Sequence, residues 1–286
     1  MHHMIKEFIQ KAILEDTLDP LGIIPKGDHS ALSCLNPLEQ KKARLIIKDS
    51  GILAGLTVAK EIFLEVDKTL HVELLLEDGA VIQYGDIRLT VSGSATSILL
   101  AERLVLNTMQ RMSGIATKTR QFVDLISHTD CKILDTRKTT PNFRHFEKAA
   151  VKIGGAVNHR FGLYDMIMLK DNHVDYCGGI VPALQRAKKY IEKLGLALPI
   201  EVETRNLNEV KQVLNEGGAA RIMLDNFTPE KCREAVDYVQ KSTPLEASGG
   251  INLDTIVSYA ETGVDYVSIG SLTYSYQSLD LSLKAF

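Results

Sequence analysis

Cysteine is scarce in this sequence, and its few copies are scattered without a CxxC pair: Cys34, Cys131, Cys177 and Cys232. We therefore expect neither a zinc site nor a disulfide framework. Reduced cysteines in a cytoplasmic enzyme are the simplest interpretation. No apolar run approaches the length of a membrane span, and the first residues lack a signal-peptide pattern, so we expect no association with a membrane.

An excess of positive charge is also absent. The net charge of -3 argues against a nucleic-acid-binding protein, which usually carries a basic excess. The 286 residues, 45% hydrophobic and 24% charged, are typical of a soluble globular protein with one large or two modest domains. His2 and His3 play no part in the interpretation.

The first part of the chain predicts an α+β sandwich domain over residues 1–113. Its signals are an amphipathic helix, three strand-like alternations and a second helix, at 5–15, 43–47, 70–75, 87–91 and 58–66. A longer helix is expected at 97–112. Residues 271–286 are expected to return and cover this domain.

A polar stripe runs along that longer helix. Arg103, Asn107, Gln110, Arg111 and Gly114 share one face of an otherwise apolar element. A polar stripe on a mostly buried helix needs partners, which a salt-bridge ridge, the edge of a site or a subunit interface would supply.

From residue 114 to 270 the pattern changes to alternating strands and helices. The expected strands are 132–135, 166–170, 200–203, 222–225, 245–248 and 266–270, and the expected helices between them are 143–153, 179–194, 207–216, 229–240 and 253–261. Such short connections imply right-handed βαβ units. We therefore predict an α/β fold with a (β/α) barrel, complete or incomplete. The alternative is an open doubly wound sheet, which is less favoured because the sequence has no GxGxxG motif.

The carboxyl ends of these strands carry a sorted set of residues. Cations come first, then Glu201, Glu203 and Asp225, and small residues last, at 248–250 and 270–271. In barrels the last loops often bind phosphate through backbone N–H groups. Because Mg²⁺ prefers one or two carboxylates with phosphate oxygens, Glu201 and Asp225 are candidate ligands, directly or through water. The alternative is that these carboxylates only pair with nearby lysines.

Cations gather in the segment 133–173, which reads as strand, loop, helix, loop and strand. Arginine binds carboxylates in a bidentate manner, so this segment suits a multiply charged acid. Its motifs Asp135-Thr-Arg-Lys-Thr-Thr-Pro141, Asn158-His-Arg160 and Leu169-Lys-Asp-Asn-His173 resemble the signature of the quinolinate phosphoribosyltransferase family, also called nicotinate-nucleotide pyrophosphorylase, carboxylating. The likeness runs from about Arg103 to Tyr274.

This resemblance implies an enzyme of NAD biosynthesis that converts quinolinate and phosphoribosyl pyrophosphate to nicotinate mononucleotide, CO₂ and diphosphate. It implies a homodimer, or a higher oligomer built from dimers, with sites shared between subunits. The residues it would place on quinolinate are Arg103, Arg137, His159, Arg160 and Lys170. The residues it would place on the phosphoribosyl donor and Mg²⁺ are Lys138, Glu201, Asp225, Ser248, Gly249, Gly250 and Gly270. Lys138, Lys170, Glu201 and Asp225 are the candidate catalytic residues.

One position departs from the family. Tyr274 stands where the family commonly has histidine, and we leave it out of the candidate site. Two other functions remain open: a Schiff-base aldolase that uses Lys138 or Lys170 as nucleophile, and a non-catalytic binding protein that has kept the phosphate site.

Overall fold

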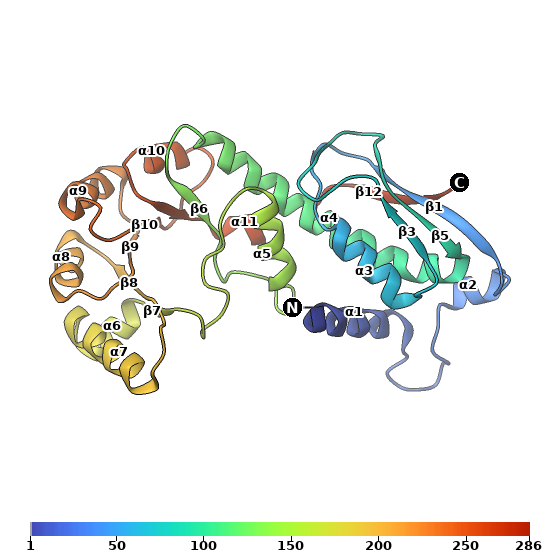
Figure 1. The fold of residues 1–286 in the computed structure, drawn as a ribbon, viewed down its shortest axis with the longest axis horizontal. Coiled ribbons are helices and arrows are strands. Elements are labelled where there is room, and N and C mark those ends of the chain that lie inside the picture. Colours follow the sequence, from blue (N-terminus) through green and yellow to red (C-terminus); the bar gives the residue numbers. More distant parts are fainter. Residues whose placement is uncertain (1) are drawn as a thin grey trace. The chain divides into compact units, whose positions relative to one another are not determined.

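The computed structural model describes residues 2–286, with side chains from residue 5 onward, and divides into two compact units (Figure 1). Of the described residues, 2–118, 141–154 and 276–286 form the first unit, and residues 119–140 and 155–275 form the second. The chain therefore passes between the units several times. The predicted boundary at 113/114 lies within a helix, and residues 141–154, expected in the barrel, belong to the first unit.

In the described part of the first unit there are two antiparallel sheets and five helices. The larger sheet has the strand order β12-β1-β5-β3, and β2 pairs with β4. The strands of this unit are β1 (Gln40–Ile47), β2 (Gly51–Ile52), β3 (His71–Leu74), β4 (Val81–Ile82), β5 (Ile87–Ser94) and β12 (Leu281–Ala285). Its helices are α1 (His2–Thr17), α2 (His29–Cys34), α3 (Leu56–Val66), α4 (Ala95–Leu125), whose last turns belong to the second unit, and α5 (Arg144–Ile153).

Strand β1 illustrates why these residues form a sheet. Ala43, Leu45 and Ile47 are buried while Arg44 and Ile46 are only partly so, which is the alternation of a strand with one face on a core. The C-terminal strand β12 pairs with β1, so that Leu283 lies opposite Leu45. The expected return of residues 271–286 is thus seen for the segment from residue 276 onward.

Helix α4 is longer than the predicted 97–112, because Gly114 does not end it. A Cβ at this position would lie 2.2 Å from the backbone oxygen of Gln277. Glycine is therefore present because the tail packs directly against the helix. Gln110 of the polar stripe donates a hydrogen bond to Leu281 O at 3.0 Å, so part of the stripe also binds the tail.

Helix α5 lies in the first unit because of aromatic and ionic contacts. Phe143 and Phe146 pack on Phe8, with ring centroids 5.5 and 4.7 Å apart. Arg111, another member of the stripe, binds the buried carboxylate of Glu147 at 2.6 Å.

A six-stranded parallel sheet forms the second unit, with the order β6-β11-β10-β9-β8-β7. Its strands are β6 (Lys132–Leu134), β7 (Ile167–Leu169), β8 (Ile200–Thr204), β9 (Arg221–Asp225), β10 (Leu245–Ser248) and β11 (Tyr266–Ser268). Its helices are α6 (Asp171–Cys177), α7 (Ile180–Leu194), α8 (Leu207–Glu216), α9 (Pro229–Val239), α10 (Ile256–Ala260) and α11 (Ser271–Tyr274).

The parallel ladder confirms the predicted α/β barrel architecture. The last strand of the unit, β11, pairs with the first, β6, as a barrel requires. Val157 adds a single bridge beside Leu134, and within residues 2–286 no ladder joins β6 to β7. The barrel is therefore incomplete.

Two helices of the second unit differ from the sequence prediction. Helix α6 begins directly after Lys170, where no helix was expected. Helix α10 begins at Ile256 rather than 253, because the Asn252 side chain accepts hydrogen bonds from the backbone of Asp254 and Thr255 and holds a turn there.

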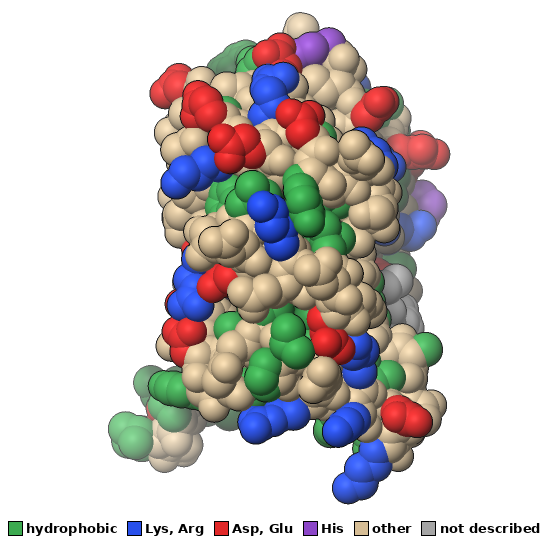
Figure 2. Space-filling model, turned by 90° about the vertical axis from the view of Figure 1, so that its left-hand side faces the viewer, with side chains coloured by type: hydrophobic (Ala, Val, Ile, Leu, Met, Phe, Trp, Pro, Cys, Tyr) green, Lys and Arg blue, Asp and Glu red, His purple; other side chains and the backbone are tan. Residues whose placement is uncertain are grey.

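The molecular surface carries charge of both signs. Figure 2 shows acidic and basic side chains spread over one face with uncharged surface between them. None of the helices in the described part of the chain combines the length and the apolar character that a membrane span needs.

Candidate active site

A cavity of about 850 Å³ opens among the carboxyl ends of the parallel strands. This is the edge at which barrel enzymes hold their substrates. Most of the residues singled out from the sequence line it: Arg137, Lys138, His159, Arg160, Lys170, Asp225, Ser248, Gly249, Gly250 and Gly270. Two do not: Glu201 is fully buried and absent from the lining, and Arg103 is an exposed residue of α4 in the first unit.

Cations form one part of the cavity wall. Arg137 and Lys138 follow β6, Arg160 precedes β7, and Lys170 follows β7. The buried Nε of Arg137 has no hydrogen-bond partner in the described part of the chain. Burial lowers the pKa of Arg160, and the charge of Arg137 lowers it further. Because the guanidinium groups of Arg137 and Arg160 interact electrostatically, they are suited to bind an anion that neutralises both.

Lys170 has a carboxylate beside it. Its Nζ lies 3.4 Å from Oε2 of Glu203, which is nearly buried and also lines the cavity. Glu203 and Glu201 point to the same side of β8, as the strand alternation predicted, but at different depths. Glu203 faces the cavity, while Glu201 lies below it.

Small residues and left-handed backbone shape the opposite wall. Gly249 has φ of +103°, and a Cβ there would lie 2.2 Å from Oδ1 of Asn226. Asn226 is itself left-handed, with φ of +57°, and its backbone N–H donates to Ser248 O at 2.8 Å. Its side chain donates to Oδ2 of Asp225 at 2.7 Å. The ends of β9 and β10 are thereby locked together beside the cavity.

Gly270 keeps Lys138 in place. A Cβ at Gly270 would lie 2.8 Å from Lys138 Cδ and 3.0 Å from Tyr274 Cε1. The Thr273 hydroxyl also donates to Lys138 O at 2.8 Å. Tyr274 lines the cavity and is 60% exposed, although it was left out of the predicted site. A one-turn helix, α11, therefore supports the lysine that follows β6.

A cluster of buried charges lies at the base of the cavity. Nε2 of His159 is 2.9 Å from Glu201 and 3.4 Å from Glu246, and Arg221 binds Glu246 at 2.8 Å. Both carboxylates are fully buried. Sequence reasoning missed Glu246 and Arg221, although a carboxylate two residues before Ser248 in an apolar strand was a visible signal.

The pKa values within this cluster are shifted strongly. Burial lowers the pKa of His159, but its hydrogen bonds to Glu201 and Glu246 and their charges outweigh burial and raise it to about 9. Burial raises the pKa of Glu201. Burial would raise that of Glu246 too, but the hydrogen bond from His159 and the charge of Arg221 lower it. Two buried carboxylates are thus stabilised by two cations.

The same cluster has the composition of a metal site, but its protonation does not suit one. With a pKa of about 9, His159 carries a proton on both ring nitrogens near neutral pH, so neither nitrogen has a lone pair for a metal.

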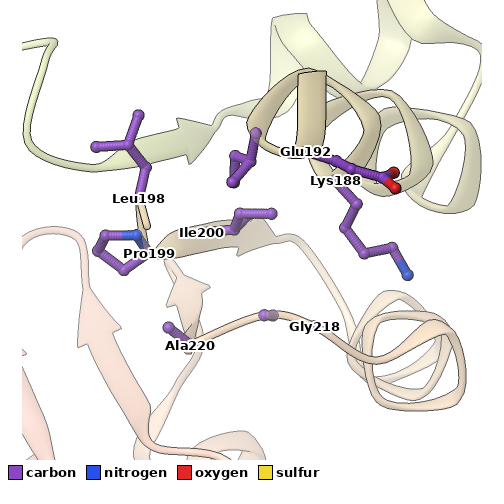
Figure 3. A pocket seen from close by; sticks show the side chains of 9 residues that line it. Lys188, Glu192, Leu198, Pro199, Ile200, Gly218 and Ala220 are labelled. Atoms are coloured by element: carbon purple, nitrogen blue, oxygen red, sulfur yellow. The ribbon is translucent and has the colours of Figure 1, made fainter. Parts of the chain in front are cut away.

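A second, smaller pocket of about 400 Å³ lies at the amino ends of β8 and β9 (Figure 3). Apolar side chains line most of it, including Leu198, Pro199 and Ile200. Its one lysine, Lys188, is already bound to Glu216 at 2.6 Å and to backbone oxygens. The cationic cavity is therefore the candidate active site.

An incomplete barrel with a cationic wall and a glycine-rich wall at its carboxyl edge is suited to a barrel enzyme that binds anionic and phosphorylated substrates. The profile of the quinolinate phosphoribosyl transferase C-terminal domain matches residues 115–284, and that of the N-terminal domain matches residues 28–113. The chain belongs to the quinolinate phosphoribosyltransferase family.

Full-length relatives agree with this assignment. The chain is 42% identical over 98% of its length to the chloroplastic nicotinate-nucleotide pyrophosphorylase [carboxylating] of Oryza sativa, of which it covers 77%. It is 39% identical over 99% of its length to a probable enzyme of the same name from Bacillus subtilis, of which it covers 93%. NadC from Streptococcus pyogenes has a similar structure, with a TM-score of 0.91, 37% identity and coverage of 99% and 96% of the two chains. These relatives argue against the aldolase and the non-catalytic binding protein.

The shifted pKa of His159 predicts a pH-dependent contribution to stability. Because the folded pKa of about 9 lies above the ordinary 6.5, the contribution is complete below pH 6.5 and is lost as the pH rises through 9. His159→Gln should therefore cost up to about 3 kcal/mol in free energy of unfolding near pH 6 and much less near pH 9.5. Urea denaturation at several pH values measures this difference.

His128→Gln is the control for that experiment, since His128 is an exposed histidine that also faces a glutamate, Glu261, at 3.1 Å. It should change the free energy of unfolding by less than about 0.5 kcal/mol at each pH. A cost of His159→Gln that stays constant from pH 6 to 9.5 would show that the cluster does not hold an extra proton.

Proposed function

We propose that the cavity transfers the phosphoribosyl group of phosphoribosyl pyrophosphate to quinolinate and releases CO₂. Family membership supports this reaction, and the observation that carries it is the division of one cavity into a cationic and a glycine-rich wall. The products are nicotinate mononucleotide, CO₂ and diphosphate.

In this proposal the cationic wall binds quinolinate. Arg137, Arg160 and Lys170 face the two carboxylates, and His159 contacts the acid from below. The ring nitrogen attacks the anomeric carbon as diphosphate leaves. The quaternary nitrogen then withdraws electrons, so the bond from the ring to the adjacent carboxylate breaks, and the electron pair left on the ring carbon takes up a proton. The cations contribute by orienting the acid and stabilising charge.

The glycine-rich wall binds the phosphoribosyl donor. Gly249 and Gly250 have left-handed backbone and present little side-chain bulk, so phosphate oxygens can approach the main chain. Lys138 lies against Gly270 and faces the same space. This arrangement supports the sequence expectation for Lys138, Ser248–Gly250 and Gly270.

Asp225 is the residue that we propose would hold Mg²⁺. This carboxylate lines the cavity beside Ser248–Gly250, and Asn226 occupies only its Oδ2. Mg²⁺ there would offset the charge of the leaving diphosphate. Glu201 is buried against His159, so we assign it to the support of that ring and not to the metal.

A dimer with shared sites is the proposed assembly. Leu99, Arg103 and Asn107 form an exposed row at intervals of four residues on α4, and Leu99 is 44% exposed. An exposed apolar residue beside an arginine suits a contact with a second copy of the chain. We propose that Arg103 reaches the quinolinate of the neighbouring subunit. A cytoplasmic location is part of the proposal as well.

The direct test follows CO₂ release from carboxyl-labelled quinolinate. Release should require phosphoribosyl pyrophosphate and should stop in excess EDTA, returning when Mg²⁺ is added. Asp225→Asn should need more Mg²⁺ for half-maximal activity. Full activity in excess EDTA would contradict the role of Mg²⁺. Absence of CO₂ release under every condition would contradict the proposed reaction.

Selectivity for the acid follows from the cationic wall. Nicotinate lacks the carboxylate next to the ring nitrogen, so its binding would leave at least one of Arg137, Arg160 and Lys170 desolvated without a counter-charge. Leaving one member of a charge pair unpaired costs roughly 2–5 kcal/mol. We therefore expect kcat/KM for quinolinate to exceed that for nicotinate by on the order of 10²-fold or more.

Steady-state kinetics with both acids measure this ratio. Arg160→Ala should lose most of the activity with quinolinate and should lower the ratio of kcat/KM for quinolinate to kcat/KM for nicotinate. Equal kcat/KM values in the unchanged protein would refute the role given to the three cations.

Shared sites predict complementation between inactive subunits. Arg103→Ala and Lys138→Ala should each be inactive. After the two are mixed and re-annealed, activity should return, because a hybrid dimer contains one site that lacks neither residue. Native mass spectrometry monitors subunit exchange. Exchange without recovered activity would place Arg103 outside the neighbour's site.

A further inference from the structure

His159 is held from two directions. Its backbone N–H donates to Oδ1 of the buried Asp135 at 2.8 Å, and its ring faces the two buried glutamates. Asp135 also accepts a hydrogen bond from the Asn158 side chain at 2.6 Å. The position of the backbone is thus set at the end of β6, and the direction of the ring is set from inside the barrel.

The two glutamates are not equivalent in this arrangement. Glu246 lines the cavity, while Glu201 does not. Arg221 binds Glu246 at 2.8 Å but is 3.9 Å from Glu201. Arg221 is in turn fixed by the ring of Tyr266, whose centroid is 4.3 Å from the guanidinium carbon. A chain of contacts therefore runs from Tyr266 through Arg221 and Glu246 to His159.

Direct contact between Glu246 and the acid would be unfavourable. A carboxylate near a dianionic substrate repels it, and the charge of Glu246 is already engaged by Arg221 and His159. A role in the core alone is also a poor explanation, because apolar residues fill a barrel interior at lower desolvation cost than a charged pair. What remains is an effect on His159.

We propose that Glu246, seated on Arg221, is a positioning residue that aims His159 at quinolinate. Its effect is geometric: the carboxylate lies 3.4 Å from Nε2 of the imidazole, and its charge keeps the ring from turning away from the acid. This inference rests on the proposed function, which assigns His159 to the quinolinate side of the cavity. Loss of the contact should weaken quinolinate binding and leave the phosphoribosyl donor almost unaffected.

Removal of Glu246 alone would strand a buried arginine, so the test removes both members of the pair. Arg221→Met combined with Glu246→Leu replaces the pair with apolar side chains of similar size, a change that proteins often tolerate. KM for quinolinate should rise on the order of 10–100-fold, as for other misplaced binding groups, while KM for phosphoribosyl pyrophosphate should change less than about threefold. The single variant Glu246→Gln keeps Arg221 and an acceptor oxygen. Its KM for quinolinate should therefore lie much closer to that of the unchanged protein than to that of the double variant.

The matched control is another buried arginine–glutamate pair. Arg111 binds the fully buried Glu147 at 2.6 Å in the first unit. Arg111→Met combined with Glu147→Leu makes the same chemical change, and both KM values should stay within about threefold of the unchanged protein. Circular dichroism and thermal unfolding establish that both double variants are folded.

Two results would overturn the inference in the folded Arg221/Glu246 double variant: an unchanged KM for quinolinate, or an equal rise in both KM values. His159→Ala separates this inference from the proposed function. If His159→Ala raises KM for quinolinate but the double variant does not, only the role of Glu246 fails. If His159→Ala has no effect either, the placement of quinolinate beside His159 fails with it.

Discussion

Burial of two carboxylates inside the barrel is the interaction on which the site depends. Glu201 and Glu246 have lost their water, and the cations that offset this cost are Arg221 and His159. Arg221 belongs to the barrel wall, but His159 also reaches the cavity. The electrostatic stability of the core and the geometry of one cavity-facing ring are therefore coupled.

In the cavity above this cluster, the cationic side chains and the glycine-rich loops occupy different walls. Cations extend from the ends of β6 and β7, the two outer strands of the sheet, whereas Asp225 and Ser248–Gly250 follow β9 and β10, which lie between them in the strand order. Parallel strands all present their carboxyl ends at one edge, so residues distant in sequence meet there. In the proposed function, one wall binds the multiply charged acid and the other binds phosphate. This sorting suits a reaction in which two anions must be brought together.

Much of this could be predicted from the sequence. The spacing of apolar runs placed the six parallel strands, and reading their ends found ten of the cavity residues. The depth of a side chain could not be predicted in that way: Glu201 and Glu203 are on the same face of β8, yet only Glu203 reaches the cavity. Nor could the sequence show that Gly114 serves packing, because a glycine in a helix also suggests an end. Helix α5 looked like a barrel helix, and only its contacts with Phe8 and Arg111 place it in the first unit.

The pairing of β12 with β1 has a consequence for how the protein folds. Ala43 lies opposite Ala285, so the larger sheet of the first unit joins strands from near both ends of the described chain. Contacts of such high sequence separation form slowly, because a long loop must close first. During synthesis, β1 has an unpaired edge until the whole barrel has been made. Strands β7 to β11, by contrast, pair in chain order, and β6 joins them through β11, so the barrel can organise while the larger sheet of the first unit still awaits its last strand.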